Sequence, residues 1–250
     1  FSAGFILRYF FWGTIIKYMF TKDLSTLAQE LKEEFVSASP FPHIVIDGLF
    51  DDETLSAAVD NMPDSETFYP QAWNRFNGEK EKKQAFDIKG IPFLPKETLD
   101  CLMALNSPEF VGFLQELLDI PDLQKDDGFR GGGLHEISEG GFLDTHIDFT
   151  RYQGLWRRAN CLLYLNKDWE ESYGGHLELY DNHPKKGGTC IEKVLPVYNR
   201  LVIFGTKKDS WHGHPTPLTC PPDRKRRSLA AYYYSPTVGE DSQEHGTIFA

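Results

Sequence analysis

Apolar residues in the first half of the chain recur at the spacing of helices. We expect an amphipathic helix after Asp23, because its apolar residues fall three or four positions apart with Lys and Glu between them. The residues that set this spacing are Leu24, Leu27, Leu31 and Phe35. Similar patterns predict a short strand at 43–46 and further helices around 52–62, 99–103 and 110–117.

After residue 126 the pattern changes to short β-like runs separated by Gly, Pro, Asn and Asp. Seven or eight strands are expected, at 133–137, 142–147, 159–165, 176–180, 189–194, 200–204, 211–214 and 228–234. Strands at this spacing are typical of a sandwich or a barrel. Because the helices come first and the strands second, the sequence predicts one α+β domain.

This change of pattern divides the chain into parts. We predict a helical N-terminal part at 19–126 that packs on the barrel, a barrel core at 127–238 and a tail at 239–250. Within the first part, residues 63–94 have no clear period and are rich in charge, glycine and aromatics. We expect a long loop there, of the kind that forms a lid or a binding surface.

The first 18 residues are apolar and aromatic, but they are interrupted by Arg8 and Lys17. A membrane-spanning helix needs roughly 20 apolar residues, and a signal peptide needs an apolar run followed by small residues at a cleavage site. Neither pattern fits well. We interpret residues 1–18 as an extension that precedes a natural start at Met19, with a weak membrane anchor as the alternative.

Charge and cysteine content narrow the class of partner and compartment. The net charge of −11 argues against a nucleic-acid partner, because phosphate binding needs a positive surface. The four cysteines are widely separated and form no CxxC pair, which argues against a zinc ribbon and a disulfide framework. We therefore expect four reduced thiols and a cytoplasmic protein.

A histidine and a carboxylate two positions apart are the first candidate for chemistry. On a strand, His146 and Asp148 would point to the same side. Two histidines and one carboxylate on one side of a metal leave other positions open, as in non-haem Fe(II) oxygen chemistry. The third ligand must come from elsewhere, and both His212 and His214 are candidates. Alone, the His-x-Asp pair is a weak signal, because such pairs are frequent on ordinary surface strands.

A second candidate lies at the head of the last predicted strand. By the same alternation Arg226 and Ser228 share a face, while Arg227 points away. A guanidinium fork suits a carboxylate, and a neighbouring hydroxyl can donate one more hydrogen bond. A dicarboxylate with one end on the metal and the other end here would be held rigidly.

The order His-x-Asp, distal His and Arg-x-Ser on short strands resembles the 2-oxoglutarate/Fe(II) dioxygenases, and most closely their prolyl 4-hydroxylase-like branch. The resemblance covers roughly residues 128–236, and further similar segments support it. These segments are 140–143, 164–169, 174–179 and 199–204. The fold it implies is a double-stranded β-helix, or jelly-roll barrel, with N-terminal supporting helices.

The resemblance also implies roles for individual residues. The iron ligands would be His146, Asp148 and the distal histidine, where the usual family pattern favours His212 and His214 remains open. Arg226 and Ser228 would bind the distal carboxylate of 2-oxoglutarate. Tyr164 is a further donor to that carboxylate, and Asn160, which shares its face, is a weaker candidate.

Two further features concern the surroundings of this site. Ile137 stands where many relatives carry a tyrosine, nine residues before the first iron histidine, so the pocket differs there from that of the peptide-prolyl enzymes. Trp156, Arg157 and Arg158 are expected in a loop over the mouth. We favour a solvated loop, with contact to the substrate as the alternative.

The function implied is hydroxylation of a prolyl or amino-acid group or of a small metabolite, with release of succinate and CO2. The cofactors implied are Fe(II), 2-oxoglutarate as cosubstrate, and ascorbate. The substrate would be a small molecule or a peptide. Two alternatives stay open: a non-catalytic jelly-roll module that binds a metal or a dicarboxylate, and a cupin-like metalloenzyme, in which the Arg-x-Ser pair would have no role.

Overall fold

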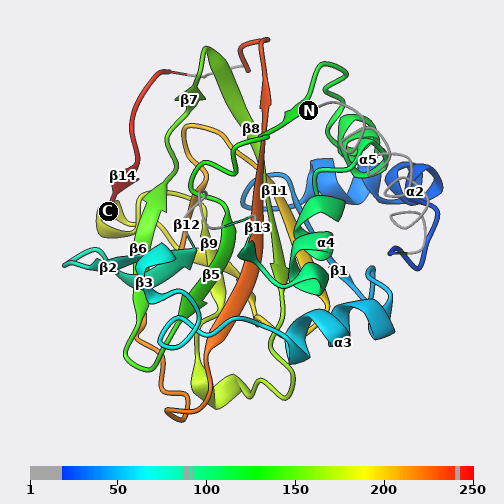
Figure 1. Cartoon of the computed structure of the whole chain (residues 1–250). Coiled ribbons are helices and arrows are strands. Elements are labelled where there is room, and N and C mark those ends of the chain that lie inside the picture. Colours follow the sequence, from blue (N-terminus) through cyan, green and yellow to red (C-terminus); the bar gives the residue numbers. More distant parts are fainter. Residues whose placement is uncertain (1–18, 87–90, 92, 240–242) are drawn as a thin grey trace.

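The structure, a computed structural model, describes residues 19–86, 91, 93–239 and 243–250. The segment 1–18, for which the sequence predicts an extension or a weak anchor, lies outside the described residues. In the described part of the chain, 14 strands form one antiparallel sheet that curls into a nearly closed barrel (Figure 1). This barrel is the predicted double-stranded β-helix.

Ten strands form the main path of the sheet, in which each strand pairs with the next. In order of pairing they are β1 (His43–Asp47), β11 (Arg200–Gly205), β8 (Leu155–Tyr164), β13 (Arg226–Ser235), β5 (Gly133–Ile137), β3 (Glu81–Phe86), β6 (Phe142–Ile147), β12 (Trp211–His214), β9 (Leu177–Tyr180) and β10 (Cys190–Val194). Off this path, β2 (Trp73–Asn77) pairs with β3, β4 (Gln124–Lys125) with β13, β7 (Arg151–Tyr152) with β8 and β14 (Ile248–Phe249) with β6.

The α-helices lie together on one side of the barrel (Figure 1). They are α2 (Leu24–Ser37), α3 (Asp52–Asp60), α4 (Lys96–Ala104) and α5 (Pro108–Leu118). Three of them begin where a side chain accepts a hydrogen bond from a backbone N–H of the first turn, which satisfies a group that the helix leaves free. The capping residues are Asp23, Asp51 and Ser107. Single-turn 3₁₀ segments occur at Pro70–Ala72, Glu171–Tyr173 and Pro184–Lys186.

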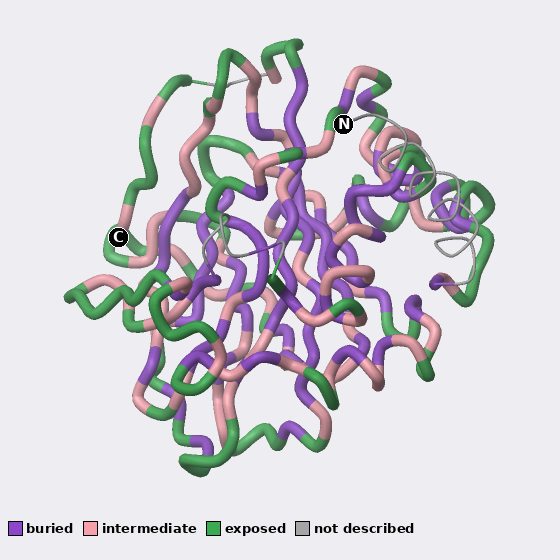
Figure 2. The backbone as a smooth tube through the Cα atoms, viewed as in Figure 1, coloured by how far each residue is buried: buried purple, intermediate pink, exposed green. Residues whose placement is uncertain are grey.

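Strand alternation separates an apolar layer from the barrel interior. On β8, Cys161 and Leu163 belong to the main core cluster, which also contains the buried faces of the helices. Tyr164, on the other face, packs inside the barrel with Leu179 and Phe204. Buried positions accordingly run along the central strands (Figure 2). The helices thus support one face of the sheet and leave the other face for the site.

The segment 63–94 differs from the loop that the sequence predicts. It contains the hairpin β2–β3, and β3 pairs with both β5 and β6 and so extends the barrel wall. The rings of Trp73 and Phe86 pack at 5.0 Å where the hairpin joins the molecule. The other residues of β2 are exposed, so the strand carries no apolar alternation. This explains why periodicity gave no signal.

The predicted tail also carries structure at its end. Ile248 and Phe249 form β14, which pairs with Ile147 and His146 of β6. Lys80, from the β2–β3 turn, donates to Ala250 O at 2.7 Å and lies 3.1 Å from the carboxylate of Asp144. The segment therefore lies against the strand that carries the His-x-Asp pair.

The helices of the described segments include none that combines the length and the apolar character needed to cross a bilayer. Cys101, Cys161, Cys190 and Cys220 are free thiols, as the sequence predicts.

Candidate metal centre

Three side chains from one end of the barrel interior converge on a single point. His146 of β6 and His212 of β12 are direct partners in the antiparallel pairing, and Asp148 follows the end of β6. One ligand atom from each of the three lies within 4.8 Å of the other two. Nε2 of His146 is 3.6 Å from Oδ1 of Asp148, and Nε2 of His212 is 3.4 Å from Oδ2. The structure therefore brings together the three residues that the resemblance names as iron ligands.

Backbone carbonyls fix the orientation of both imidazoles. Nδ1 of His146 lies 2.9 Å from the carbonyl oxygen of Asp144, and Nδ1 of His212 lies 2.8 Å from that of Ser210. A carbonyl oxygen only accepts, so each Nδ1 carries the proton and each Nε2 keeps its lone pair. Metal-binding histidines are commonly held in this way. Two imidazole nitrogens and one carboxylate oxygen, all facing one point, fit a divalent transition metal.

Asp148 is held in its ionised form by two further side chains. Nη2 of Arg157 lies 3.0 Å from its Oδ2, and Nδ2 of Asn160 donates to the same oxygen at 2.7 Å. Burial alone would raise the pKa of Asp148, but the charge of Arg157 and the contacts with the two histidines hold it well below its usual value. The carboxylate is therefore available as a metal ligand at neutral pH.

Arg157 is the functional candidate that sequence reasoning missed. The segment 156–158 is not a loop over the mouth but the start of β8. Strict alternation would place Arg157 with Ala159 on the helix-covered face. A register shift between Tyr233 and Tyr234 on the paired strand β13 marks a bulge, which turns Arg157 to the side of Asn160. Its Nε donates to Oδ1 of Asn160 at 2.8 Å, and its side chain is almost fully buried.

The second histidine of β12 takes a different place. His214 is buried and faces the barrel interior like His212, but it is not among the three residues whose ligand atoms converge. A register shift in the β6–β12 pairing, between His212–His146 and His214–Leu143, marks a bulge. Gly213 lies between the two histidines, and a Cβ there would come within 2.9 Å of the carbonyl oxygens of Leu143 and Asp144. Only glycine permits that approach.

Arg226 and Ser228 lie at the far end of the interior, where the sequence places a carboxylate clamp. Nε of Arg226 donates to the carbonyl oxygen of Gly175 at 2.8 Å, and Nη2 donates to the hydroxyl of Tyr164 at 3.2 Å. The residue is buried, with only 5% of its surface exposed, and no carboxylate among the described residues pairs with its guanidinium. Burial accordingly lowers its pKa. A buried cation without a counter-ion is costly, so this arrangement suits an anionic ligand.

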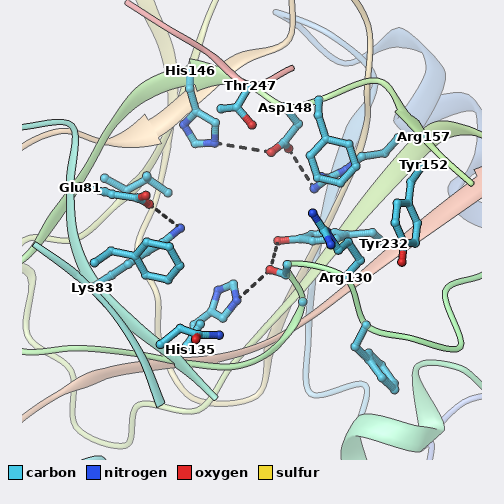
Figure 3. A pocket seen from close by; sticks show the side chains of 18 of the residues that line it. Glu81, Lys83, Arg130, His135, His146, Asp148, Tyr152, Arg157, Tyr232 and Thr247 are labelled. Carbon is cyan, nitrogen blue, oxygen red and sulfur yellow. Dashed lines mark hydrogen bonds and ion pairs between the residues drawn. The ribbon is translucent and has the colours of Figure 1, made fainter. Parts of the chain in front are cut away.

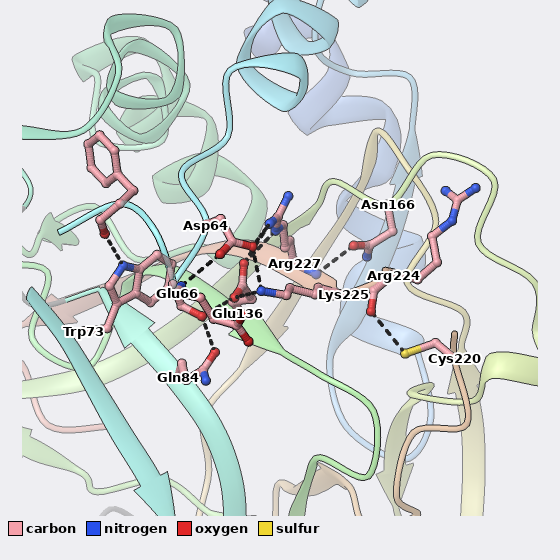
Figure 4. A network of polar contacts seen from close by, with 12 residues as sticks. Asp64, Glu66, Trp73, Gln84, Glu136, Asn166, Cys220, Arg224, Lys225 and Arg227 are labelled. Carbon is pink, nitrogen blue, oxygen red and sulfur yellow. Dashed lines mark hydrogen bonds and ion pairs between the residues drawn. The ribbon is translucent and has the colours of Figure 1, made fainter. Parts of the chain in front are cut away.

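Arg227, whose side chain faces away from the barrel interior, does have a carboxylate partner. Arg227 contacts the carboxylate of Glu136 at 2.8 Å, and Lys225 lies 3.0 Å from the same group (Figure 4). Lys225 also lies 2.6 Å from the carboxylate of Asp64, which ties the segment before the β2–β3 hairpin to the barrel. The predicted alternation is therefore realised. Arg227 is neutralised by Glu136 outside the barrel interior, whereas Arg226 faces the interior and has no carboxylate partner in the described part of the chain.

The inner cavity joins the metal group to the clamp. It has a volume of about 90 Å³, and its walls include Asn160, Leu162, Phe204, His214, Arg226 and Ser228. Ile137 also lines it, as expected from the position where relatives carry a tyrosine. Tyr164 contacts the site indirectly, because its hydroxyl accepts a hydrogen bond from Arg226. Asn160 faces the cavity, but its amide nitrogen bonds Asp148 and its oxygen accepts from Arg157.

The outer cavity opens on the other side of the metal group and has a volume of about 590 Å³ (Figure 3). Its walls include Phe76, Arg130, Phe149, Tyr152, Tyr232 and Phe249. His146, Asp148, Lys83 and His135 border both cavities. Lys83 pairs with Glu81 at 2.9 Å, opposite the metal group in Figure 3. The metal group therefore stands between a small inner space and a larger outer one.

A comparison with known families agrees with this geometry. Residues 132–234, which hold all seven predicted site residues, match the family model described as the 2OG-Fe(II) oxygenase superfamily. The matched part of the barrel belongs to this superfamily. The match begins with β5 and ends within β13, so it covers the strands that carry the site. It leaves the α-helices, the β2–β3 hairpin and the strands β1, β4 and β14 outside.

Individual relatives of the oxygenase barrel are distant. A segment of 86 residues, 33% of this chain, is 30% identical to prolyl 3-hydroxylase OGFOD1 of Mus musculus but spans only 15% of that protein. The fold is similar to a prolyl hydroxylase of Trichoplax adhaerens, solved with a hypoxia inducible factor peptide fragment (TM-score 0.60, 14% identity, 85% of this chain and 90% of that one). It is also similar to a prolyl-4-hydroxylase of Pseudomonas putida (TM-score 0.55, 16% identity, 84% and 99%). At these identities the structural likeness concerns the fold.

Proposed function

We propose that the chain is an Fe(II)- and 2-oxoglutarate-dependent dioxygenase that hydroxylates its substrate and releases succinate and CO2. One observation carries the proposal. Three converging metal-ligand side chains line the same small cavity as a buried guanidinium that has no carboxylate partner among the described residues. A ligand that fits both ends needs a chelating group and a far carboxylate, and 2-oxoglutarate has both.

The residues of the site would have separate roles: some would hold the iron, and others would orient the cosubstrate or support a metal ligand. His146, Asp148 and His212 would hold the iron, which supplies, with 2-oxoglutarate and O2, the oxidising chemistry of the superfamily. Arg226 and Ser228 would bind the far carboxylate and so fix the cosubstrate in one orientation. Arg157 would keep Asp148 ionised and in place.

The outer cavity is the place we propose for the substrate. Its aromatic walls and its volume of about 590 Å³ suit a prolyl or amino-acid group, within a peptide or free, or a small metabolite. The prolyl hydroxylases among the relatives support a prolyl group, whereas Ile137 argues for a pocket that differs from theirs. We also propose that ascorbate keeps the iron reduced and that the protein acts in the cytoplasm.

Binding and turnover can be tested separately. Anaerobic addition of Fe(II) and 2-oxoglutarate to the purified protein should give a weak visible charge-transfer absorption. Admission of O2, with panels of peptides, amino acids and small metabolites, should then give succinate. Absorption without succinate from any panel would instead indicate a non-catalytic binding module. No absorption at all would remove the cosubstrate from the proposal.

A matched pair of variants on one strand would locate the site. Asp148→Ala should reduce Fe(II) affinity more than about hundredfold, because loss of a direct ligand costs more than loss of the groups behind it. Asp144→Ala removes a carboxylate from the same segment that points instead toward Lys80. It should leave metal affinity and succinate formation within about twofold. Unchanged Fe(II) affinity in Asp148→Ala would place the metal elsewhere.

A further inference from the structure

Within the described residues, the inner cavity holds a buried polar side chain that has no hydrogen-bond partner. Neither Nδ1 nor Nε2 of His214 has a hydrogen-bond partner in the described part of the chain, and both atoms are buried. The residue is 4% exposed. An unsatisfied polar group in such surroundings costs about 1–3 kcal/mol. The two other histidines of the strand pair, His146 and His212, each have a carbonyl partner, so the lack of one at His214 is specific to this position.

The position of His214 relates it to the clamp. β12 carries His212 at the metal end, and His214 lies two residues further on, in the inner cavity with Arg226 and Ser228. Two cationic side chains, Lys83 and Arg226, line the same cavity. An imidazole carries at least one ring N–H in either protonation state, so His214 can donate a hydrogen bond. A donor that lies among cations at the end of a cavity needs an acceptor, and an anionic one fits best.

We propose that His214 is a third donor to the far carboxylate of 2-oxoglutarate, beside Arg226 and Ser228. The inference rests on the proposed cosubstrate. It gives His214 the part of a specificity-determining residue, because its N–H is satisfied only by a ligand that carries an acceptor at that end. The inner cavity then favours a dicarboxylate over a 2-oxo acid of the same length without the second carboxylate.

Two ligands and one variant separate this role from a structural one. The dissociation constants of 2-oxoglutarate and 2-oxovalerate, which lacks the far carboxylate, are measured anaerobically on the Fe(II)-loaded protein. His214→Leu should weaken 2-oxoglutarate about ten- to hundredfold and leave 2-oxovalerate within about twofold, because a hydrogen bond to a charged group is lost with only one of them. Equal affinity for 2-oxoglutarate in both proteins would refute the role. Equal loss of both ligands would do the same, because it would indicate general damage to the cavity.

The ligand-free protein gives an independent readout. Leu replaces an unsatisfied imidazole with an apolar group, so the melting temperature of His214→Leu without ligand should equal or exceed that of the natural chain. A histidine that only packs, or that binds an ordered water, predicts a lower melting temperature with unchanged 2-oxoglutarate affinity.

A measurement on the natural chain covers the case in which the variant does not fold. In a proton–nitrogen NMR spectrum, the ring N–H of His214 should become protected from exchange when 2-oxoglutarate binds, but not when 2-oxovalerate binds. The same result with both ligands would contradict the proposal. If the natural chain binds no 2-oxoglutarate at all, it is the proposed function that fails, and the two failures remain distinguishable.

Discussion

The two cavities that meet at the metal group are built in different ways. The inner cavity is lined mainly by inward-facing positions of central strands, among them Leu162 on β8, Phe204 on β11 and Ser228 on β13. The outer cavity is lined to a large extent by connections and by edges of the sheet: Phe76 on the β2–β3 hairpin, Tyr152 on β7 and Phe249 on β14. The inner cavity is formed by the alternating side chains of the strands. The outer cavity is formed by the segments that cover the barrel mouth.

Their electrostatics differ as well. In the inner cavity the guanidinium of Arg226 faces the interior without a carboxylate partner among the described residues. In the outer cavity Lys83 pairs with Glu81, and Arg157 pairs with Asp148. The inner cavity is thus prepared for one small anion, whereas the charges that border the outer cavity are largely balanced within the protein. This difference is why the cosubstrate can be inferred from the chain while the substrate is inferred only as a class.

The largest expected effect contrasts two adjacent arginines. Arg226→Met should raise the dissociation constant of 2-oxoglutarate about hundredfold or more, because the ligand carboxylate would lose its buried partner, while Fe(II) affinity stays within about threefold. The stability of the ligand-free variant should change little. Removal of a buried cation that has no carboxylate partner among the described residues offsets the loss of its hydrogen bonds to Gly175 and Tyr164. Calorimetric titration and urea unfolding measure the two quantities.

Arg227→Met is the control on the opposite face. It leaves the buried carboxylate of Glu136 with Lys225 as its remaining cation, so it should lower the free energy of unfolding by about 1–3 kcal/mol and leave 2-oxoglutarate affinity within about threefold. If the two variants gave the same pattern, the two faces of β13 would not be distinct in function.

A smaller effect is expected behind the metal. Arg157→Met should weaken Fe(II) binding about ten- to hundredfold, the range found when a group that orients a metal ligand is lost. At saturating Fe(II), 2-oxoglutarate affinity should change by less than about threefold, because Arg157 contacts Asp148 and not the clamp. Arg158→Met provides the matched control, since this neighbour donates to the carbonyl oxygen of Thr237 at the surface. Fe(II) affinity that is equal in both variants would mean that Asp148 needs no such support.

Most of the barrel could be predicted from the sequence because its strands are short β-like runs, separated by Gly, Pro, Asn and Asp, along which side chains alternate between two faces. The strands 133–137, 142–147 and 211–214 have the predicted bounds. The convergence of His146, Asp148 and His212 follows from the same alternation together with the resemblance. By contrast, β2 has one buried residue, Trp73, and therefore shows no period.

The other features that the sequence did not predict have two causes: irregular strands and pairings between distant segments. The bulge opposite Tyr233 and Tyr234 moves the side chain of Arg157 to the other face of β8, and no local residue pattern predicts this bulge. The pairing of Phe249 with His146 joins positions about 100 residues apart along the chain. Asn160 lies on the predicted face, but its hydrogen bond to Asp148 joins two segments that local patterns do not bring together. Local patterns predict which face a residue takes only while the register is unbroken.

The smallest effect separates the outer cavity from the inner one. The ring of Phe249 lies 5.5 Å from that of His146 and forms part of the outer wall. Phe249→Ala should raise the Michaelis constant for the accepted substrate about three- to tenfold, because one aromatic wall contact is lost, while the Michaelis constant for the cosubstrate stays within about twofold. Ile248→Ala, at an exposed neighbour on the same strand, should change neither constant. The opposite result, in which only the Michaelis constant for the cosubstrate rises, would mean that β14 supports the metal side of His146 and does not bound the substrate space. In that case β14 would belong with β6 to the cosubstrate side of the metal group, and it would not be part of the wall of the substrate cavity.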